Sequence, residues 1–180
     1  IQLSILKSSI VEVEIPTDVA VTGAIHKIAS ENNIKFIICG SNLATEGILP
    51  DLWFYDPKDL RLLKSIQKRF GKNSLKSFPD FDYKKEIYYK FISGIRQIYL
   101  LNYLPYNKED AIKTLENEVN WKNYGGKHHE SVYTRFVQSY LQPVKFDLDY
   151  RRATFSSQIC TGEITREYAL EELRKKPYDP

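Results

Sequence analysis

A short apolar run at residues 34–39 gives the clearest strand signal in the chain. Phe36, Ile37 and Ile38 are aromatic or β-branched, and the run is too short for a helix. This pattern predicts a strand buried on both faces of a parallel sheet. The segment that follows, residues 40–50, is polar at most of its first positions. Because open α/β sheets bind small molecules beyond the carboxyl ends of their strands, a binding site is expected there.

The residues before this strand predict an amphipathic helix that ends near Asn32 and Asn33. Thr17 or Asp18 is its expected cap. Its expected inward face is the helical stripe of Val21, Ala24, Ile25 and Ile28. A helix, a short turn and a buried strand make half of a βαβ unit. The sheet therefore needs at least one further strand, from a missing part of the protein or from another chain.

The rest of the chain predicts mainly helices. Asp56 and Pro57 are expected to start a helix that carries Leu60, Leu63, Ile66 and Phe70 inward. A Tyr- and Phe-rich helix at 83–94 is followed by a short strand or extended link. Three further helices are expected to start at the cap Asn107, after residue 130 and at the cap Thr165. Their expected buried residues are Ala111, Ile112, Leu115 and Val119; Val132, Tyr133, Phe136, Val137, Tyr140 and Leu141; and Ala169, Leu170 and Leu173.

Composition narrows the class of protein. With 180 residues, of which 42% are apolar, the chain can bury the core of one domain. The formal charge of +3 is too small for a dedicated nucleic-acid binder. The basic residues of the helix after Pro57, such as Lys58, Arg61 and Lys64, are spread around it, which favours a solvated face, although a sugar-nucleotide phosphate could use some of them. No run of about twenty apolar residues predicts a membrane span, and Cys39 and Cys160 are expected to be free core thiols, so the cytoplasm is the expected location.

Two polar segments carry the candidate chemistry. In the first, Gly40 allows the backbone to turn close to a ligand, and hydroxyl, amide and carboxylate groups follow from Ser41, Asn42, Thr45 and Glu46. An ordinary turn explains this spacing equally well. The second segment is Tyr-Gly-Gly-Lys-His-His-Glu at residues 124–130, which opens a helix. Glu130 there is also favoured by the helix dipole, and the adjacent histidines have no third ligand at metal spacing, so a metal site is not predicted.

Resemblance to a known family adds to this interpretation. The segment Gly-Ser-Asn-Leu-Ala-Thr-Glu-Gly-Ile-Leu-Pro at 40–50 resembles the corresponding loop of the N-acetyl sugar amidotransferases. These are ATP-using PP-loop enzymes of bacterial surface-polysaccharide and lipopolysaccharide pathways. The likeness continues in family order at residues 14–18, 124–131, 134–136, 145–146, 156–162, 166–167 and 176–180.

The resemblance implies a fold, a reaction and partners. The fold would be α/β, a partial adenine nucleotide alpha-hydrolase-like (Rossmann-like) sheet with a mostly helical C-terminal part. ATP, with Mg²⁺, would adenylate the oxygen of a sugar N-acetyl group, and ammonia would displace AMP to leave an acetamidino group. A separate glutaminase subunit would supply the ammonia, and the substrate would be an N-acetylated nucleotide sugar or a sialic-acid-like sugar.

The resemblance also suggests roles for the polar residues. Glu46, His128 and Glu130 are the candidate catalytic residues, of which His128 and Glu130 match the Gly-Gly-Lys-His-x-Glu pattern of the family. Contacts to the nucleotide are expected from Gly40, Ser41, Asn42 and Thr45, and contacts to the substrate from Lys127, Arg135 and Lys145.

One departure from the family pattern limits these assignments. The Ser-Gly-Gly-x-Asp-Ser phosphate loop does not occur in the sequence, which also contains no Met. The chain is therefore expected to be the C-terminal part of a longer protein and inactive alone. Residues 1–56 would be the end of the PP-loop domain, and 57–180 a helical region packed on it. A PP-loop enzyme that thiolates or otherwise modifies tRNA, and a non-catalytic docking module, are the alternatives.

Overall fold

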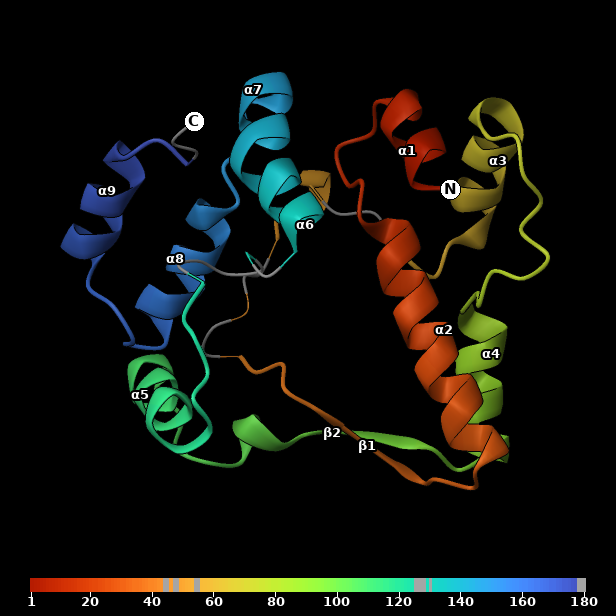
Figure 1. Cartoon of the computed structure of the whole chain (residues 1–180), viewed down its shortest axis with the longest axis horizontal. Helices are drawn as coiled ribbons and strands as arrows, with labels where there is room; N and C mark the ends of the chain where they lie inside the picture. The colour runs from red at the N-terminus through yellow and green to blue at the C-terminus, as the bar shows by residue number, and fades with distance from the viewer. Residues whose placement is uncertain (44–45, 47–48, 54–55, 125–128, 130, 178–180) are drawn as a thin grey trace. The chain divides into compact units, whose positions relative to one another are not determined.

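The chain folds into two compact units in a computed structural model that describes residues 1–43, 46, 49–53, 56–124, 129 and 131–177. The first unit is built from Ile1–Cys39 and Asp51–Ile98, and the second from Gly40–Pro50 and Tyr99–Pro180. These units do not coincide with the expected parts 1–56 and 57–180, and that assignment of domains stays a prediction. The described chain is mostly helical with one small sheet, so it is α/β with little sheet (Figure 1).

The sheet consists of two parallel strands, β1 (Phe36–Cys39) and β2 (Arg96–Tyr99). The backbone N–H of Arg96 donates a hydrogen bond to the carbonyl of Lys35 over 2.8 Å. The strand predicted at 34–39 is therefore present, but the prediction that it is buried on both faces was wrong. Phe36 is 58% exposed and Ile38 is 70% exposed. Parallel sheets are normally covered on both faces, so this pair of strands leaves an apolar surface uncovered.

The helix before the sheet, α2 (Ile15–Glu31), buries a different side from the one predicted. Val21, Ile25 and Ile28 are exposed. Its buried stripe consists of Ile15, Pro16, Val19, Gly23, His26 and Ala29. The small residues Gly23 and Ala29 on this side let other parts of the chain approach closely, whereas Val21, Ile25 and Ile28 face outward.

Gly23 is the point of closest approach on α2. A Cβ atom there would lie 2.3 Å from the carbonyl oxygen of Pro79 and 2.8 Å from that of Asp80. On the next turn, His26 contacts two aromatic rings that also stack on each other, with centroid distances of 4.7 Å to Phe81 and 5.4 Å to Tyr89. Because glycine has no side chain, position 23 allows this helix to pack closely against residues 79–93.

The other helices of the first unit are α1 (Gln2–Ser8), α3 (Leu60–Phe70) and α4 (Tyr83–Ile87), with a 3-10 turn η1 (Asp51–Trp53) and a π-helical turn η2 (Tyr88–Ile92) after α4. Helices α1 and α3 pack together, with the Ser4 hydroxyl donating to Gln67 Oε1 over 2.5 Å. Asp59, and not the predicted Asp56, caps α3. Asp56 instead accepts from the N–H of Lys58, so it closes a turn before the helix.

Besides residues 40–50, the second unit contains a 3-10 turn η3 (Leu100–Asn102) and helix α5 (Lys108–Val119), which Asn107 caps as predicted. A longer helical stretch follows as α6 (Val132–Phe136), the π-helical turn η4 (Val137–Leu141) and α7 (Gln142–Phe146). The π-helical turn ends at Leu141, two residues before Pro143, whose missing N–H cannot continue the α-helical pattern. The last helices are α8 (Arg151–Cys160) and α9 (Arg166–Arg174), the latter capped by Thr165 as predicted.

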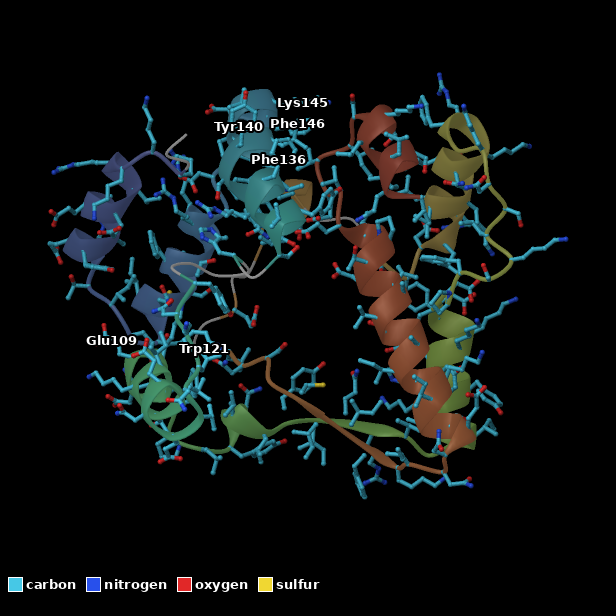
Figure 2. The ribbon with its side chains drawn as sticks, in the orientation of Figure 1. Glu109, Trp121, Phe136, Tyr140, Lys145 and Phe146 are labelled. Atoms are coloured by element: carbon cyan, nitrogen blue, oxygen red, sulfur yellow. The ribbon has the colours of Figure 1, made fainter. Side chains whose placement is uncertain are left out.

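Several apolar residues of this second unit that were predicted to be buried are exposed. They are Leu115, Val119, Val132, Phe136, Tyr140 and Leu170. Phe136 and Tyr140 stack on each other with their centroids 5.7 Å apart (Figure 2). Arg151 fixes the end of α9, since it donates to the carbonyls of Glu172 and Lys175 over 3.1 and 2.8 Å. Both cysteines are free thiols, and Cys160 is exposed, not in a core. No helix in the described part of the chain has the length and apolarity needed to cross a membrane.

Replacing Gly23 by alanine is expected to destabilise the chain, because the added methyl group would overlap two backbone carbonyls. The free energy of unfolding should fall by about 1–3 kcal/mol, measured by urea denaturation. Thr22→Ala, at the neighbouring position, is the matched control and should change the stability by less than about 0.5 kcal/mol. Alanine normally stabilises a helix relative to glycine, so an increase in stability would contradict the close packing.

Asp18 is expected to make stability depend on pH. Burial, followed by the charges of Glu12 and Glu14, raises its pKa from 3.8 to about 6. The folded state therefore holds this proton more tightly than the unfolded state, and stability is lost as the pH rises through this range. Asp18→Asn should raise the melting temperature at pH 7.5 and leave it unchanged near pH 3.5. Asp18 is nevertheless exposed to solvent, which screens these charges, so the gain should stay below about 1 kcal/mol. An equal effect at both pH values would contradict this assignment.

Candidate functional site

The loop that follows β1 is joined to the turn that follows β2. The backbone N–H of Leu43 donates to Asn102 Oδ1 over 2.9 Å, and the N–H of Glu46 donates to the carbonyl of Asn42 over 3.2 Å. Asn42 is only 6% exposed, while Ser41 is exposed. Parallel strands end at the same edge of their sheet, so the segments that leave them start side by side. The predicted loop therefore has a fixed neighbour in the same unit.

Gly40 was predicted to allow the backbone to turn close to a ligand, and its own backbone and surroundings in the described chain bear on this requirement. Its φ angle is not in the left-handed region, and a Cβ atom at this position would meet no atom within 4 Å. Neither backbone conformation nor packing within the described chain requires glycine there.

Tyr106 lies near two carboxylates, those of Glu46 from the loop and of Glu163. Its hydroxyl has a pKa raised first by burial and then by the negative charges of Glu163 and Glu46. Both carboxylates therefore lie close enough to oppose ionisation of the phenol. We call Glu46, Tyr106 and Glu163 the Tyr106 cluster. A tyrosine phenol is protonated at neutral pH even without this shift, so Tyr106 is a hydrogen-bond donor there.

Glu163 is held in place from two directions. Its Oε2 accepts hydrogen bonds from Asn107 Nδ2 over 3.2 Å and from the N–H of Lys108 over 3.5 Å, at the start of α5. A carboxylate is favoured there by the helix dipole. On the other side, Gly162 ends α8 with φ of 77°, a conformation that glycine adopts without strain, and the N–H of Glu163 then donates to the carbonyl of Gln158 over 2.9 Å.

A pocket of about 390 Å³ adjoins the Tyr106 cluster. Tyr106 and Asn107 line it together with Asp110, Ala111 and Thr114 from the first turns of α5. Small-molecule sites of proteins have volumes of about 300–1,000 Å³, so this pocket is large enough for part of a metabolite. The cluster thus combines two carboxylates, a phenol and an adjacent cavity.

The predicted site residues fall into three groups. Gly40, Ser41, Asn42 and Glu46 belong to the loop just described. Arg135 and Lys145 have exposed side chains on the helical stretch of residues 132–146, where the Lys145 ammonium lies 5.2 Å from the centroid of the Phe146 ring (Figure 2). The remaining predictions, Thr45, Lys127, His128 and Glu130, lie outside the described residues.

The roles assigned to all of these residues stay predictions. The loop at 40–50 and residues 124–146 do belong to the same compact unit, which a shared site requires. Among the described residues, no group of three or more His, Cys, Asp or Glu side chains could hold a metal ion.

Sequence analysis did not identify Asn102, Tyr106 or Glu163. None of them belongs to a recognisable motif, and Tyr106 and Glu163 are far apart in the chain. The one local signal was the Thr-Gly-Glu sequence at 161–163, since a glycine that ends a helix fixes the direction of the next residue. Proximity of the three residues depends on how β2, α5 and α8 pack.

Comparison with known proteins gives one match. Residues 130–180 match the family model described as LPS biosynthesis protein WbpG-like, C-terminal domain. The match covers α6 to α9 and includes Glu163, but less than half of the chain. Comparisons with curated proteins and with solved structures give no match. The C-terminal helices therefore resemble a domain of lipopolysaccharide biosynthesis proteins.

Changing Glu163 to glutamine should lower the pKa of Tyr106 toward its ordinary value, because it removes one of the charges that disfavour the phenolate. Burial would keep part of the increase. The titration can be followed by NMR with ¹³C-labelled tyrosine, assigned through Tyr106→Phe. Glu167→Gln, on the exposed side of α9, is the control and should leave the Tyr106 titration unchanged. An unchanged or higher Tyr106 pKa in Glu163→Gln would show that the two groups are not neighbours.

Proposed function

We propose that this chain is part of an ATP-dependent N-acetyl sugar amidotransferase of lipopolysaccharide or other surface-polysaccharide biosynthesis. The observation that carries the proposal is the match of residues 130–180 to a family of LPS biosynthesis proteins. It is supported by the resemblance of residues 40–50 to the amidotransferase loop, since that loop contributes Glu46 to the Tyr106 cluster and belongs to the same unit as residues 130–180. Two segments far apart in sequence thus point to the same class of protein.

The reaction needs an activated amide, because the nitrogen lone pair makes an amide carbonyl a poor electrophile. ATP supplies this activation by transferring AMP to the carbonyl oxygen of the N-acetyl group, with release of pyrophosphate. Ammonia then adds to the carbon, AMP leaves, and one proton of the ammonia nitrogen must be removed to give the amidine. Positioned acids and bases contribute about 10²–10⁴-fold to such proton transfers.

The Tyr106 cluster suits this proton transfer. In the proposed site, Glu46 or Glu163 accepts the proton from the attacking nitrogen. Tyr106, whose pKa is raised, keeps its own proton and donates a hydrogen bond to an oxygen of the substrate. His128 and Glu130 remain candidates for a second proton-transfer pair, and Lys127, Arg135 and Lys145 for contacts to an anionic sugar or its nucleotide. Asn42 and Thr45, with Gly40 and Ser41, would contact the nucleotide.

The proposed activity requires a phosphate-binding loop that this sequence does not contain. Exposure of Phe36 and Ile38 on β1 supports a further α/β segment that covers this strand and carries the loop. Mg²⁺ usually binds substrate phosphates together with one or two carboxylates, so Glu46 is the candidate protein ligand in this chain. A glutaminase subunit is the proposed source of ammonia.

The test uses a protein in which these 180 residues are joined to the phosphate-loop part, supplied with ATP, ammonia and an N-acetylated nucleotide sugar. Mass spectrometry of the sugar measures acetamidino formation. His128→Ala and at least one of Glu46→Gln and Glu163→Gln should lower the rate by about 10²-fold or more, since each of these changes removes a candidate proton-transfer group. Glu116→Gln, an exposed substitution on α5, is the control and should retain the wild-type rate.

The outcome also separates the alternatives. Near-normal turnover in all three variants would remove the Tyr106 cluster and His128 from the mechanism. Salt-dependent binding of tRNA, with no amidine formed, would instead support a tRNA-modifying enzyme. Binding of a glutaminase with no affinity for ATP or sugar would support a docking module.

A further inference from the structure

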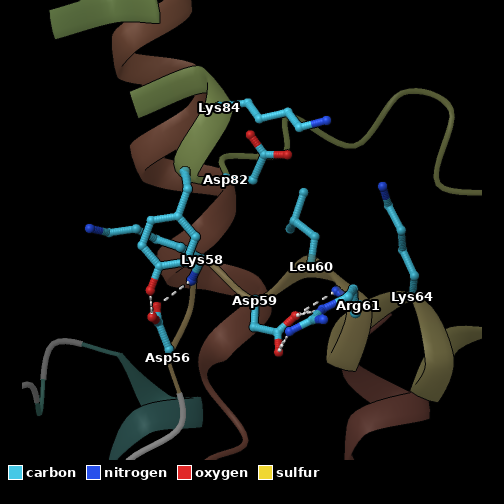
Figure 3. Close-up of a pocket in the computed structure, with 9 residues that line it drawn as sticks. Asp56, Lys58, Asp59, Leu60, Arg61, Lys64, Asp82 and Lys84 are labelled. Carbon is cyan, nitrogen blue, oxygen red and sulfur yellow. Dashed lines mark hydrogen bonds and ion pairs between the residues drawn. The ribbon is translucent and has the colours of Figure 1, made fainter. Parts of the chain in front are cut away.

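The first unit has a pocket of its own, lined in part by the basic residues Lys58, Arg61 and Lys64 of the segment for which the sequence left open a phosphate contact. Its volume is about 480 Å³, and it lies between the start of α3 and the start of α4 (Figure 3). Leu60 forms an apolar part of its wall, and the remaining lining side chains are charged except for Tyr83. All of them belong to residues 56–84, so the pocket is formed within one unit.

Two of the four cations that line the pocket have carboxylate partners. Arg61 binds Asp59 through Nε over 3.1 Å, and this pairing lowers the pKa of the Asp59 carboxyl. Lys58 Nζ lies 3.0 Å from both oxygens of Glu86 and 5.3 Å from the centroid of the Tyr83 ring. These two positive charges are therefore neutralised by neighbours.

The other two cations, Lys64 and Lys84, have no ion pair with any described carboxylate. They come from different elements, Lys64 from α3 and Lys84 from α4. Figure 3 shows both side chains extending along the same side of the pocket. Two like charges on one wall oppose each other, and an anion between them would remove that repulsion.

The remaining acidic groups in the lining bind donors of the chain itself. Asp56 accepts from the N–H of Lys58 over 2.9 Å and from the Tyr83 hydroxyl. Asp82 accepts from the N–H of Lys85 over 2.9 Å as the cap of α4. These contacts hold the carboxylates in place and fix the Tyr83 ring at the pocket, where it is 52% exposed.

We propose that this pocket binds a phosphate-bearing small molecule, with its phosphate between Lys64 and Lys84 and its organic part against Tyr83. A phosphate carries nearly two charges and can neutralise both ammonium groups, whereas a monocarboxylate would neutralise one. The pocket volume is suited to a nucleotide or a sugar phosphate. The inference uses only the first unit and does not depend on the proposed amidotransferase activity.

Isothermal titration of the full chain with inorganic pyrophosphate tests the anion site, and titrations with ATP and with UDP-N-acetylglucosamine test the organic part. We expect pyrophosphate to bind with Kd below about 1 mM at low salt and more weakly as salt is added. The double variant Lys64→Gln/Lys84→Gln should weaken binding at least about tenfold, because it removes both ammonium groups. The control Lys68→Gln/Lys72→Gln carries the same change of charge on exposed residues outside the pocket, and should bind within about twofold of wild type.

Tighter binding of ATP than of pyrophosphate would identify a nucleoside triphosphate as the ligand class, and tighter binding of the UDP-sugar a nucleotide sugar. Tyr83→Leu should then remove that preference while pyrophosphate still binds. Absence of pyrophosphate binding at about 10 mM would overturn the proposal. Equal weakening by the two double variants would also overturn it, since this would show diffuse attraction to a basic surface.

Discussion

The parallel pairing of β1 and β2 is the constraint on which the candidate site depends. Because both strands run in the same direction, the Gly40 loop and the turn that ends at Asn102 leave the sheet at one edge. The bond from the Leu43 N–H to Asn102 joins them there. Only a few residues further on, the chain reaches Tyr106 and the start of α5. The position of the loop next to these residues therefore follows from the direction of the two strands and not from a motif in the loop.

Local signals in the sequence predicted some local features correctly, although α2 starts at Ile15, before its expected cap Thr17 or Asp18. The short strand, the cap of α5 at Asn107 and the cap of α9 at Thr165 follow from residue type and spacing, since they depend on neighbouring groups alone. The start of α3 was placed too early because Asp56 and Asp59 both have the chemistry of a cap. Asp59 caps the helix by accepting from the N–H of Arg61, while Asp56 closes the preceding turn.

Which side chains are buried was harder to predict, because burial depends on how the helices and strands pack against one another. Helix α2 has a stripe of large aliphatic residues and a stripe that contains Gly23 and Ala29, and periodicity favours the first. Backbone carbonyls at 79 and 80 can approach only the second, so the described chain covers that side. The Tyr106 cluster was missed for the same reason, because its members meet only when β2, α5 and α8 are assembled. His128 and Glu130 lie outside the described residues, so their predicted roles rest on the sequence resemblance.

Neither compact unit is formed by a continuous stretch of chain. Residues 40–50 belong to the second unit, yet the chain returns to the first at Asp51 and remains there until Ile98. A fragment that starts at Tyr99 would retain every helix from α5 to α9 but lose Glu46 and the partner of Asn102. If the helical region were exchanged between related proteins, the eleven residues 40–50, which lie in the N-terminal half of the chain, would have to be exchanged with it. The two units are therefore expected to be inherited together, since a single recombination event that replaced one of them would divide the site.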